Sequence, residues 1–591
     1  MILVFGGTTE GRKAVEVLEA AGRPYYYSTR GSEQEVALVH GQRLTGGMNT
    51  QEMIAFCQEH AIRLIVDAAH PFAELLHWNL LNVADQLQLP LVRYDRIYPH
   101  HTSDIIWCRD YDDAIAQLEA QGIQRLLALT GVQTIGRLRP YWQHHECWFR
   151  ILDRDSSRDI ASQTGFPENH LISDSPSLIS PLSTLNSHIS PDAIVTKESG
   201  ISGGFLEKVE AAKAMGMKVF VVERPAIPQL PNSNYQLVNG PHGLRRAIEH
   251  LLPDFYPLKS GLTTGTCATA AAVAALHRLR TGETPDEVPV LLPDGETIKV
   301  SVGFADDYAF CIKDAGDDPD VTNGVEVRAK VQPAEHFVIF GGEGVGRFTL
   351  PGFDYPPGEA AINRGPREML RDNIPGDYAV TISVVGGGEI ARRTFNPRLG
   401  IEGGISIIGV SGIVQPYSEE AFLESIRKCL VVAIASGAER IVIGSGAKSE
   451  EALRGRYPQL PSQAFVQYGN FVGATLRMAV ELGARHVTLG VMLGKAVKLA
   501  AGALDTHSRR STFDRDFVRQ LLGEAGCDPA LAEGITLVRE LWDILPEQSL
   551  PAFVNVILHH CYHHCQPLLP IGRLTILLVD DNGRVWPSIN T

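Results

Sequence analysis

Short apolar runs alternate with helix-like segments over the first 250 residues of the chain. Residues 1–5 are apolar, residues 9–21 place apolar side chains at helical spacing, and residues 25–28 form a second apolar run. Further apolar runs, each followed by a turn or a helix start, occur at residues 64–66, 126–129, 193–195 and 219–222. This alternation predicts Rossmann-like parallel sheets that helices cover on both faces.

The pattern changes after residue 257. Residues 253–258 form a short junction that contains proline, and residues 268–279 predict a long Ala-rich helix. Earlier, residues 166–191 are rich in Ser, Pro and Asn, and they predict a surface loop. We therefore expect an α/β region over residues 1–252 with two subdomains, a linker over 253–258, and a region over 259–591 that is α+β to about residue 400 and α/β after it.

Composition and charge narrow the class of protein. The 591 residues carry 53 Lys plus Arg against 68 Asp plus Glu, a net charge of −15. No basic face or tail for nucleic acid is visible, and a polyanionic small molecule would need a locally basic pocket. No apolar run approaches the ~18 residues that cross a bilayer, and the nine cysteines come without an export signal. We expect a cytoplasmic protein that binds neither nucleic acid nor membrane; a homo-oligomer remains open.

A glycine-rich loop lies between the first predicted strand and the first predicted helix. In the run Gly6-Gly7-Thr8-Thr9-Glu10-Gly11, the glycines let the backbone approach a phosphate, and the free N–H groups of a helix start favour negative charge. A plain glycine turn accounts for this spacing equally well, because it is not G-x-G-x-x-G. Arg30 stands where a ribose-binding acid is expected, which favours NADPH over NADH. An exposed Arg without a ligand is the competing interpretation.

Three further segments follow predicted strands, at the sheet edge where ligands bind. They are residues 66–73 with Asp67 and His70, residues 130–134 with Gly131, and residues 196–200 with Lys197. With the opening loop, they resemble precorrin-6A reductase, also called cobalt-precorrin-6A reductase, over most of residues 1–250. The resemblance implies hydride transfer from a reduced nicotinamide to a carbon–carbon double bond of a tetrapyrrole macrocycle.

A proton must balance such a hydride, and Asp67 and His70 are candidate donors or polarisers. His70 could instead be a helix-cap or core histidine. Lys197 could hold a substrate carboxylate, or it could pair with Glu198 or Glu223. The candidate contacts of NADPH or NADH are Gly6, Gly7, Thr8, Thr9, Arg30 and Gly131.

Long, unusual segments mark the second half of the chain. They are residues 261–270, 313–324 and 394–409, together with 344–347 and 505–508. These segments closely resemble cobalt-precorrin-5B C1-methyltransferase, from about Lys259 to the last residue. The resemblance implies methyl transfer from S-adenosylmethionine to the macrocycle, a reaction that needs no enzyme nucleophile, so we expect Cys267 to be structural.

Candidate binding residues in this half have structural alternatives. The candidate substrate contacts are Thr264, Thr266, Arg347, Arg367 and Arg398. The two threonines could cap the Ala-rich helix or bind a substrate carboxylate at its start. The three arginines could form an anion pocket or a salt-bridged surface. Two glycine turns are suitable for S-adenosylmethionine, although bare α/β turns look the same. Their residues are Gly409, Ser411, Gly412, Gly444 and Gly446.

We assign no metal site. Asp314, Asp317, Asp318 and Asp320 could form a calcium loop, but the required spacing is absent, and turn or cap roles are favoured. The histidines and cysteines of residues 559–565 are dense enough to share a metal, yet no second ligand pair stands at finger spacing.

The two resemblances describe consecutive steps, because the methyltransferase product is the substrate that the reductase would accept. The sequence therefore predicts a bifunctional enzyme of cobalamin precursor synthesis. One rival is an NADP-dependent oxidoreductase with an unrelated, ligand-binding C-terminal domain. Another is a nucleotide sensor or tetrapyrrole carrier without turnover.

Overall fold

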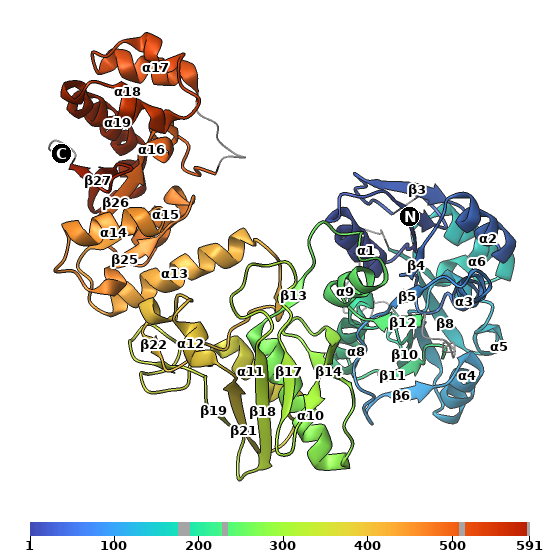
Figure 1. The fold of residues 1–591 in the computed structure, drawn as a ribbon. Helices are drawn as coiled ribbons and strands as arrows, with labels where there is room; N and C mark the ends of the chain where they lie inside the picture. Colours follow the sequence, from blue (N-terminus) through green and yellow to red (C-terminus); the bar gives the residue numbers. More distant parts are fainter. Residues whose placement is uncertain (33, 175–188, 227–234, 508–513, 588–591) are drawn as a thin grey trace. The chain divides into compact units, whose positions relative to one another are not determined.

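The computed structural model describes residues 1–32, 34–174, 189–226, 235–507 and 514–587 (Figure 1). Residues 175–188 of the expected Ser-rich loop lie outside the described residues. The chain forms two compact units, Met1–Lys259 with Leu291–Lys299, and Ser260–Val290 with Val300–Thr591. No helix within the described ranges has the length and apolarity that a bilayer crossing requires.

The first unit contains a six-stranded sheet in which every pairing is parallel, in the order β12-β5-β4-β1-β2-β3. Alternate residues of one strand enter two cores: Val4 packs with helices α1 and α9, whereas Leu3 packs with α2 and α3. The elements are β1 (Ile2–Phe5), α1 (Thr9–Glu19), β2 (Tyr25–Thr29), β3 (Gly41–Thr45), α2 (Thr50–Glu59), β4 (Leu64–Asp67), α3 (Glu74–Leu87), β5 (Leu91–Tyr94), β12 (Tyr235–Val238) and α9 (Pro241–Leu251).

A second six-stranded parallel sheet follows in the same unit, in the order β6-β11-β10-β7-β8-β9. Its elements are β6 (Ile106–Cys108), α4 (Tyr111–Ala120), β7 (Arg125–Ala128), α5 (Arg139–Trp142), β8 (Glu146–Leu152), α6 (Asp155–Thr164), β9 (Leu171–Asp174), β10 (Ala193–Lys197), α8 (Phe205–Ala214) and β11 (Lys218–Val222). The two sheets confirm the Rossmann-like architecture that the sequence predicts.

The second unit begins with an α+β part. The Ala-rich helix α10 (Thr264–Thr281) packs against a sheet of order β16-β17-β18-β21-β19. Its small side chains, such as Ala268 and Ala271, are buried and let the helix approach the sheet closely. The strands are β16 (Gly303–Phe304), β17 (Ala309–Ile312), β18 (Glu326–Pro333), β19 (Val338–Gly341) and β21 (Tyr378–Val384), and helix α11 (Arg364–Asn373) lies beside α10.

An α/β part follows, with a sheet of order β25-β24-β26-β27-β28 that is parallel except for β28. Its elements are α13 (Glu419–Ala435), β24 (Ile441–Gly444), α14 (Ala447–Arg456), β25 (Phe465–Gln467), α15 (Val472–Glu481), β26 (His486–Met492), α16 (Leu493–Ala500), α17 (Arg515–Glu524), α19 (Leu550–Cys565), β27 (Arg573–Val579) and β28 (Val585–Pro587). This multidomain α/β and α+β organisation confirms the predicted fold class.

The expectation that residues 407–412 form a strand and turn of an α/β sheet is wrong. Ile407 makes only an isolated bridge with Ile362. The strand that follows the turn, β23 (Ile413–Val414), pairs antiparallel with β13 (Gly261–Leu262). This turn therefore belongs to the α+β part, because the parallel sheet starts only at β24.

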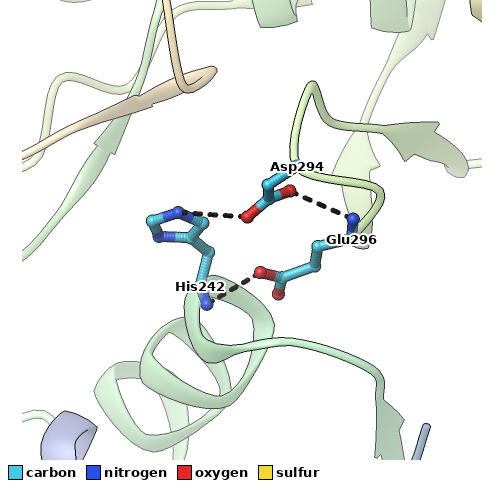
Figure 2. Close-up of side chains that lie close together, drawn as sticks. All are labelled: His242, Asp294 and Glu296. Carbon is cyan, nitrogen blue, oxygen red and sulfur yellow. Dashed lines mark hydrogen bonds and ion pairs between the residues drawn. The ribbon is translucent and has the colours of Figure 1, made fainter. Parts of the chain in front are cut away.

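Helix α9 is capped by a residue that is distant in sequence (Figure 2). Glu296 is 1% exposed, and its carboxylate accepts the backbone N–H of His242 at 3.0 Å and that of Gly243. A Cβ atom on Gly240 would lie 2.2 Å from the Glu296 carboxyl carbon, so this approach requires glycine. His242, Asp294 and Glu296 offer ligand atoms within 4.8 Å of one another. Both Glu296 oxygens already accept helix N–H groups, so we assign no metal here.

Replacing Glu296 by Gln tests this cap through its pH dependence. Burial raises the pKa of Glu296 from 4.5 to about 7, so its contribution to stability is present below pH 4.5 and is lost as the pH rises through 7. The loss amounts to at most about 3 kcal/mol, and it is absent in Glu296→Gln. Amide hydrogen exchange of Pro241–Leu251, compared between the two proteins at about pH 5.5 and about pH 8, should show the difference. Identical pH dependence in both proteins would contradict this account.

Candidate functional sites

The loop between β1 and α1 has one open glycine and two packed ones. A Cβ atom on Gly6 would lie 2.2 Å from the Tyr27 hydroxyl oxygen, and one on Gly11 would lie 2.6 Å from it. Gly7 has φ +95°, and a Cβ there would have no atom within 4 Å. Thr8 caps α1, because its Oγ1 accepts the Gly11 N–H at 3.1 Å. Tyr27 therefore explains Gly6 and Gly11. Gly7 is exposed, but its N–H already donates to the Tyr27 hydroxyl at 3.1 Å, so a phosphate would have to displace this bond.

The other expected nucleotide contacts lie at separate positions. Thr9 is the first residue of α1 and is half-buried, and Arg30 is exposed directly after β2. Gly131 has φ +82° after β7, a conformation that favours glycine. Arg30 forms no ion pair with another described residue, so its guanidinium is available to solvent or to an anion.

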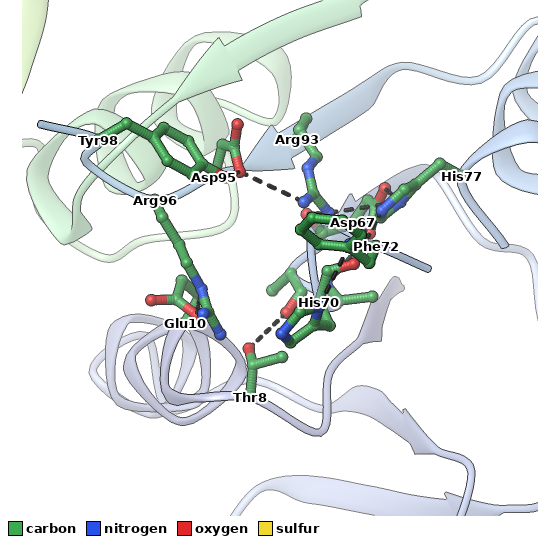
Figure 3. A network of polar contacts seen from close by, with 12 residues as sticks. Thr8, Glu10, Asp67, His70, Phe72, His77, Arg93, Asp95, Arg96 and Tyr98 are labelled. Atoms are coloured by element: carbon green, nitrogen blue, oxygen red, sulfur yellow. Dashed lines mark hydrogen bonds and ion pairs between the residues drawn. The ribbon is translucent and has the colours of Figure 1, made fainter. Parts of the chain in front are cut away.

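Asp67 is a buried anchor at the end of β4 (Figure 3). It is 3% exposed, and its two oxygens contact Arg93 Nη1 at 2.8 Å and His77 Nδ1 at 2.6 Å. Burial would raise the pKa of Asp67, but the Arg93 guanidinium and the His77 hydrogen bond hold it below its ordinary value. Asp67 is thus an enclosed carboxylate, which does not suit the proton-donor role that the sequence offered for it.

His70 lies beside this anchor but has a different environment (Figure 3). Its Nδ1 accepts the Phe72 N–H at 3.2 Å, so the neutral ring carries its proton on Nε2. Burial, together with Arg96 and Lys197, lowers the pKa of His70 to about 3. His77 Nε2 donates to the His70 carbonyl at 3.0 Å. His70 is therefore a neutral hydrogen-bond donor whose backbone the Asp67–His77 pair positions.

A buried ion pair joins the two sheets of the first unit. Arg96 Nε donates to Glu10 at 2.9 Å, and Arg96 Nη1 donates to the Ser199 carbonyl at 2.6 Å. Ser202 also donates to Glu10, which lies in the first turn of α1. A Cβ on Gly203 would lie 2.6 Å from Arg96 Nη1. This clamp connects the start of α1 to the loop that follows β10.

Lys197, the last residue of β10, lies in this clamped region without an acidic partner among the described residues. Glu198 is taken by Arg224, whose Nη1 and backbone N–H donate to it at 2.6 and 3.0 Å. Lys197 Nζ lies 5.2 Å from the Phe72 ring centroid. Burial, with the charges of Arg137 and Lys208, lowers the pKa of Lys197 to about 8. The pairing of Lys197 with Glu198 or Glu223 is thus not formed, and its ammonium group suits a carboxylate ligand.

In the second unit, the threonines fasten helix α10 to the turn at residues 408–412. Thr263 caps the helix, and Thr266 Oγ1 donates to the Gly412 carbonyl at 2.5 Å. Thr264 Oγ1 donates to the Ile408 carbonyl at 3.2 Å and accepts the Ile408 N–H at 2.9 Å. Thr266 is 0% exposed. Its hydroxyl is therefore structural and does not suit the expected substrate contact.

The turn that packs on α10 has close backbone contacts at Gly409, although the side chain of Val410 is exposed. A Cβ on Gly409 would lie 2.3 Å from Thr263 Oγ1, and the Gly409 carbonyl lies 2.6 Å from the Cβ position of Gly365. Ser411 Oγ donates to the Ile413 carbonyl at 3.1 Å. These contacts leave Gly409, Ser411 and Gly412 with packing roles, in place of the open glycine turn that a nucleotide site requires.

The arginines of this half are mostly paired. Arg398 Nη1 contacts Glu450 at 2.6 Å, and Arg367 Nη2 contacts Glu359 at 3.2 Å. Arg364 and Arg392 also pair with glutamates. Arg347 donates only to the Gly358 carbonyl, at 3.0 Å, among the residues that the structure describes. The salt-bridged alternative therefore describes most of this set, and Arg347 has the most available charge.

The acidic segment at residues 314–320 has turn and cap roles. Asp320 contacts the buried Lys313 Nζ at 2.7 Å, and Asp314 accepts the Gly316 N–H at 2.9 Å. Asp318 accepts the Tyr417 N–H at 3.0 Å. Lys313 and backbone N–H groups thus answer the negative charge, as the turn interpretation predicts.

The histidine and cysteine cluster is divided by the geometry of helix α19. Cys561 and Cys565 are 0% exposed and lie in the core, where Cys561 Sγ contacts the Ala496 carbonyl oxygen at 3.2 Å. His560 faces outward and contacts Glu524 at 2.7 Å. Neighbouring residues of a helix point in different directions, so the dense spacing does not gather these side chains.

The fold and sites define a two-part enzyme chain: a doubly wound unit of the kind that binds dinucleotides, joined to an α+β and α/β unit. Residues 1–242 match the family model of precorrin-6x reductase CbiJ/CobK. Residues 254–416 match the CbiD model, and residues 505–588 match the model of the CbiD C-terminal domain. The chain therefore belongs to the CbiD family over its second unit and carries a CbiJ/CobK-type domain in its first.

Similar proteins also match the chain in two separate parts. A cobalt-precorrin-5B C(1)-methyltransferase from Prosthecochloris aestuarii is 46% identical over 345 residues, which are 54% of this chain and 94% of the relative. A solved cobalamin biosynthesis protein (cbiD) from Archaeoglobus fulgidus is 30% identical and covers 43% of this chain and 83% of its own, with a TM-score of 0.25. The solved CobK precorrin-6A reductase is 20% identical and covers 43% and 98%, with a TM-score of 0.35. TM-scores of this size establish no shared overall fold.

Arg93 should be essential for the stability of the first unit. Arg93→Met leaves the Asp67 carboxylate buried without its cation, so the free energy of unfolding should fall by about 3–5 kcal/mol. Denaturant unfolding of the variant and the wild type measures this difference. The double variant Asp67→Asn with Arg93→Met removes both charges and should recover part of the loss. If the double variant is the less stable of the two, the ion pair is not the cause.

Proposed function

We propose that this chain catalyses two consecutive steps of cobalamin precursor synthesis. The second unit methylates cobalt-precorrin-5B at C1 with S-adenosylmethionine, and the first unit reduces the resulting cobalt-precorrin-6A to cobalt-precorrin-6B with NADPH or NADH. The proposal is carried by two matches to separate parts of the chain. One covers 94% of the length of a methyltransferase relative, and the other is the match of residues 1–242 to the reductase family model.

In the first unit, the exposed turn at Gly7 leaves space for a cofactor phosphate at the start of α1, beside Thr8 and Thr9, if the phosphate replaces the Tyr27 hydroxyl as acceptor of the Gly7 N–H. Arg30 would meet a 2′-phosphate, which favours NADPH. Gly131 follows β7, at the carboxyl edge of the second sheet. A bound reduced nicotinamide supplies the hydride. The protein's own residues orient the macrocycle and exclude water from it.

The three polar residues proposed for the reductase site divide into different roles. Asp67, held by Arg93 and His77, positions the loop that carries His70. His70 presents a neutral Nε2–H that can polarise the macrocycle through a hydrogen bond. Lys197 provides a cation near Phe72, and a carboxylate of the substrate is its natural partner. The tetrapyrrole precursors carry several acetate and propionate groups, which suits this arrangement.

In the second unit, methyl transfer requires positioning more than covalent help. The electron-rich ring carbon attacks the sulfonium methyl in line, the new C–C bond forms as the S–C bond breaks, and the sulfur leaves as a neutral thioether. Cys267 is 0% exposed within α10, which fits a structural role. Gly444 ends the parallel strand β24 and Gly446 lies in the turn after it, so this is the better placed of the two glycine turns for the methyl donor.

The rival interpretation, an oxidoreductase with an unrelated C-terminal domain, is disfavoured by the near full-length match of the second unit to methyltransferases. Joining the two steps in one chain keeps the intermediate at a high local concentration for the second step.

Mass spectrometry of the product tests the two activities in sequence. The purified chain, given cobalt-precorrin-5B and S-adenosylmethionine, should add one methyl group, and later addition of NADPH should add two hydrogens. Lys197→Met serves as an internal control, because it should slow only the reduction. Absence of the methyl shift in the wild-type protein would refute the methyltransferase assignment, and absence of the reduction would refute the other.

The reductase should lose affinity for its macrocycle in alkaline solution. The pKa of Lys197 is lowered to about 8, so its ammonium form is present below this pH and is lost as the pH rises through it. The KM for cobalt-precorrin-6A should therefore rise above pH 8, by roughly tenfold or more for one charged hydrogen bond. Lys197→Arg, whose guanidinium stays charged, should shift this rise to higher pH, and Lys197→Met should have a high KM throughout. A rise that persists unchanged in Lys197→Met would assign it to another group.

A further inference from the structure

The five-stranded sheet of the second unit reverses its strand order beside β24. The chain passes from β24 through α14 to β25 on one side, and then through α15 to β26 on the other side of β24. In open α/β sheets, such a switch point at the carboxyl ends of the strands is where ligands bind. The carboxyl ends of β24 and β26 are therefore the place to look for a ligand.

Residues from separate parts of the chain meet at this edge. Gly446, in the turn after β24, is open, because a Cβ there would have no atom within 4 Å. Lys495, in the first turn of α16 after β26, donates from Nζ to the Gly469 carbonyl at 2.5 Å. The Thr506 N–H donates to the Asn470 carbonyl at 3.0 Å, which brings the segment with Asp505 to the same edge.

Lys495 has no acid partner among the described residues at this edge. Lys495 has three N–H groups, of which one reaches the Gly469 carbonyl, and no carboxylate pairs with it in the described ranges. Lys498 donates to the Thr506 carbonyl at 3.2 Å. Glu450, the acid nearest in sequence to the glycine turn, is already bound by Arg398 at 2.6 Å and by Gln467 at 2.8 Å. Burial, and then Lys498, lower the pKa of Lys495, as expected for an ammonium group without an acid beside it.

We propose that Lys495 binds a ligand carboxylate at the β24–β26 switch point, and that this carboxylate is the amino-acid end of the sulfonium methyl donor. The proposal rests on the methyltransferase function proposed above, and it names a contact that the function alone does not. The open turn at Gly446 leaves space for the nucleoside end. The turn at residues 409–412 is the less suitable of the two, because the Gly409 backbone packs closely against Thr263 and Gly365. The second source of the same chemistry is an acetate or propionate group of the macrocycle.

Two nucleosides that differ in the carboxylate test the contact. S-adenosylhomocysteine carries the amino-acid end, whereas 5′-methylthioadenosine lacks it. Calorimetric titration of the full chain should show tighter binding of S-adenosylhomocysteine to the wild type, and Lys495→Met should weaken that binding at least tenfold while leaving 5′-methylthioadenosine unchanged. Lys495→Arg should retain part of the preference. Lys330→Met, on the exposed side of β18, makes the same change of charge elsewhere and should bind like the wild type.

The outcomes separate the inference from the function on which it rests. If the wild type binds S-adenosylhomocysteine and Lys495→Met binds it equally well, with an unchanged KM for cobalt-precorrin-5B, the carboxylate contact is refuted and the function stands. If only the KM for the macrocycle rises, the contact with the methyl donor is refuted, and Lys495 binds a carboxylate of the macrocycle instead. If the folded wild type neither binds S-adenosylhomocysteine nor transfers a methyl group, the proposed function fails first. Circular dichroism of each variant verifies folding.

Discussion

The compensation of buried charge at the carboxyl ends of parallel strands governs both units of this protein. A carboxylate or ammonium group taken out of water must meet an opposite charge or hydrogen-bond partners, or it destabilises the fold. Four acids at or beside these edges have cationic partners: Asp67 has Arg93, Glu10 has Arg96, Glu198 has Arg224, and Glu450 has Arg398. Lys197 and Lys495 are two cations at these edges that pair with no acid among the described residues.

This asymmetry matters because the chain as a whole is acidic, with a net charge of −15. An acidic surface repels an anionic ligand, so binding has to be achieved by local cations in sites that are partly shielded from water. With these acids neutralised inside the protein, Lys197 and Lys495 make the local potential positive, which suits a carboxylate ligand without requiring a basic surface.

Much of the fold could be predicted from the sequence because it depends on local patterns. Apolar runs at residues 1–5, 64–66 and 193–195 correspond to β1, β4 and β10, since a parallel strand buried on both faces is apolar throughout. The prediction for residues 407–412 was wrong for the same reason. An apolar run followed by glycine looks like a parallel strand and its turn, but this segment packs on α10 and leads into a strand that pairs with β13. The pattern of apolar residues predicts that a strand forms, but it does not predict which strand or helix packs beside it.

The candidate site was only partly predictable, because its key contacts join distant residues. Asp67 and His70 are visible in the sequence as polar residues after a strand, but the partner Arg93 comes 26 residues later inside an apolar strand. Likewise Arg96 meets Glu10 across 86 residues, and Glu296 meets Gly243 across 53. An Arg within an apolar run such as Leu91–Tyr94 is the one signal that could have been used, since a buried Arg requires an acid.

The glycines of the second unit show why a motif can identify a family without identifying its site. A Cβ on Gly344 would lie 1.9 Å from the Val384 carbonyl oxygen, and one on Gly261 would lie 2.2 Å from the Ala315 backbone. These glycines are required by close packing between the long family segments, and they would be required whatever ligand the protein bound. Packing does not explain the open turn at Gly446 or the two lysines without acid partners among the described residues, Lys197 and Lys495. The proposed ligand contacts therefore rest on these residues and not on the glycines that identify the family.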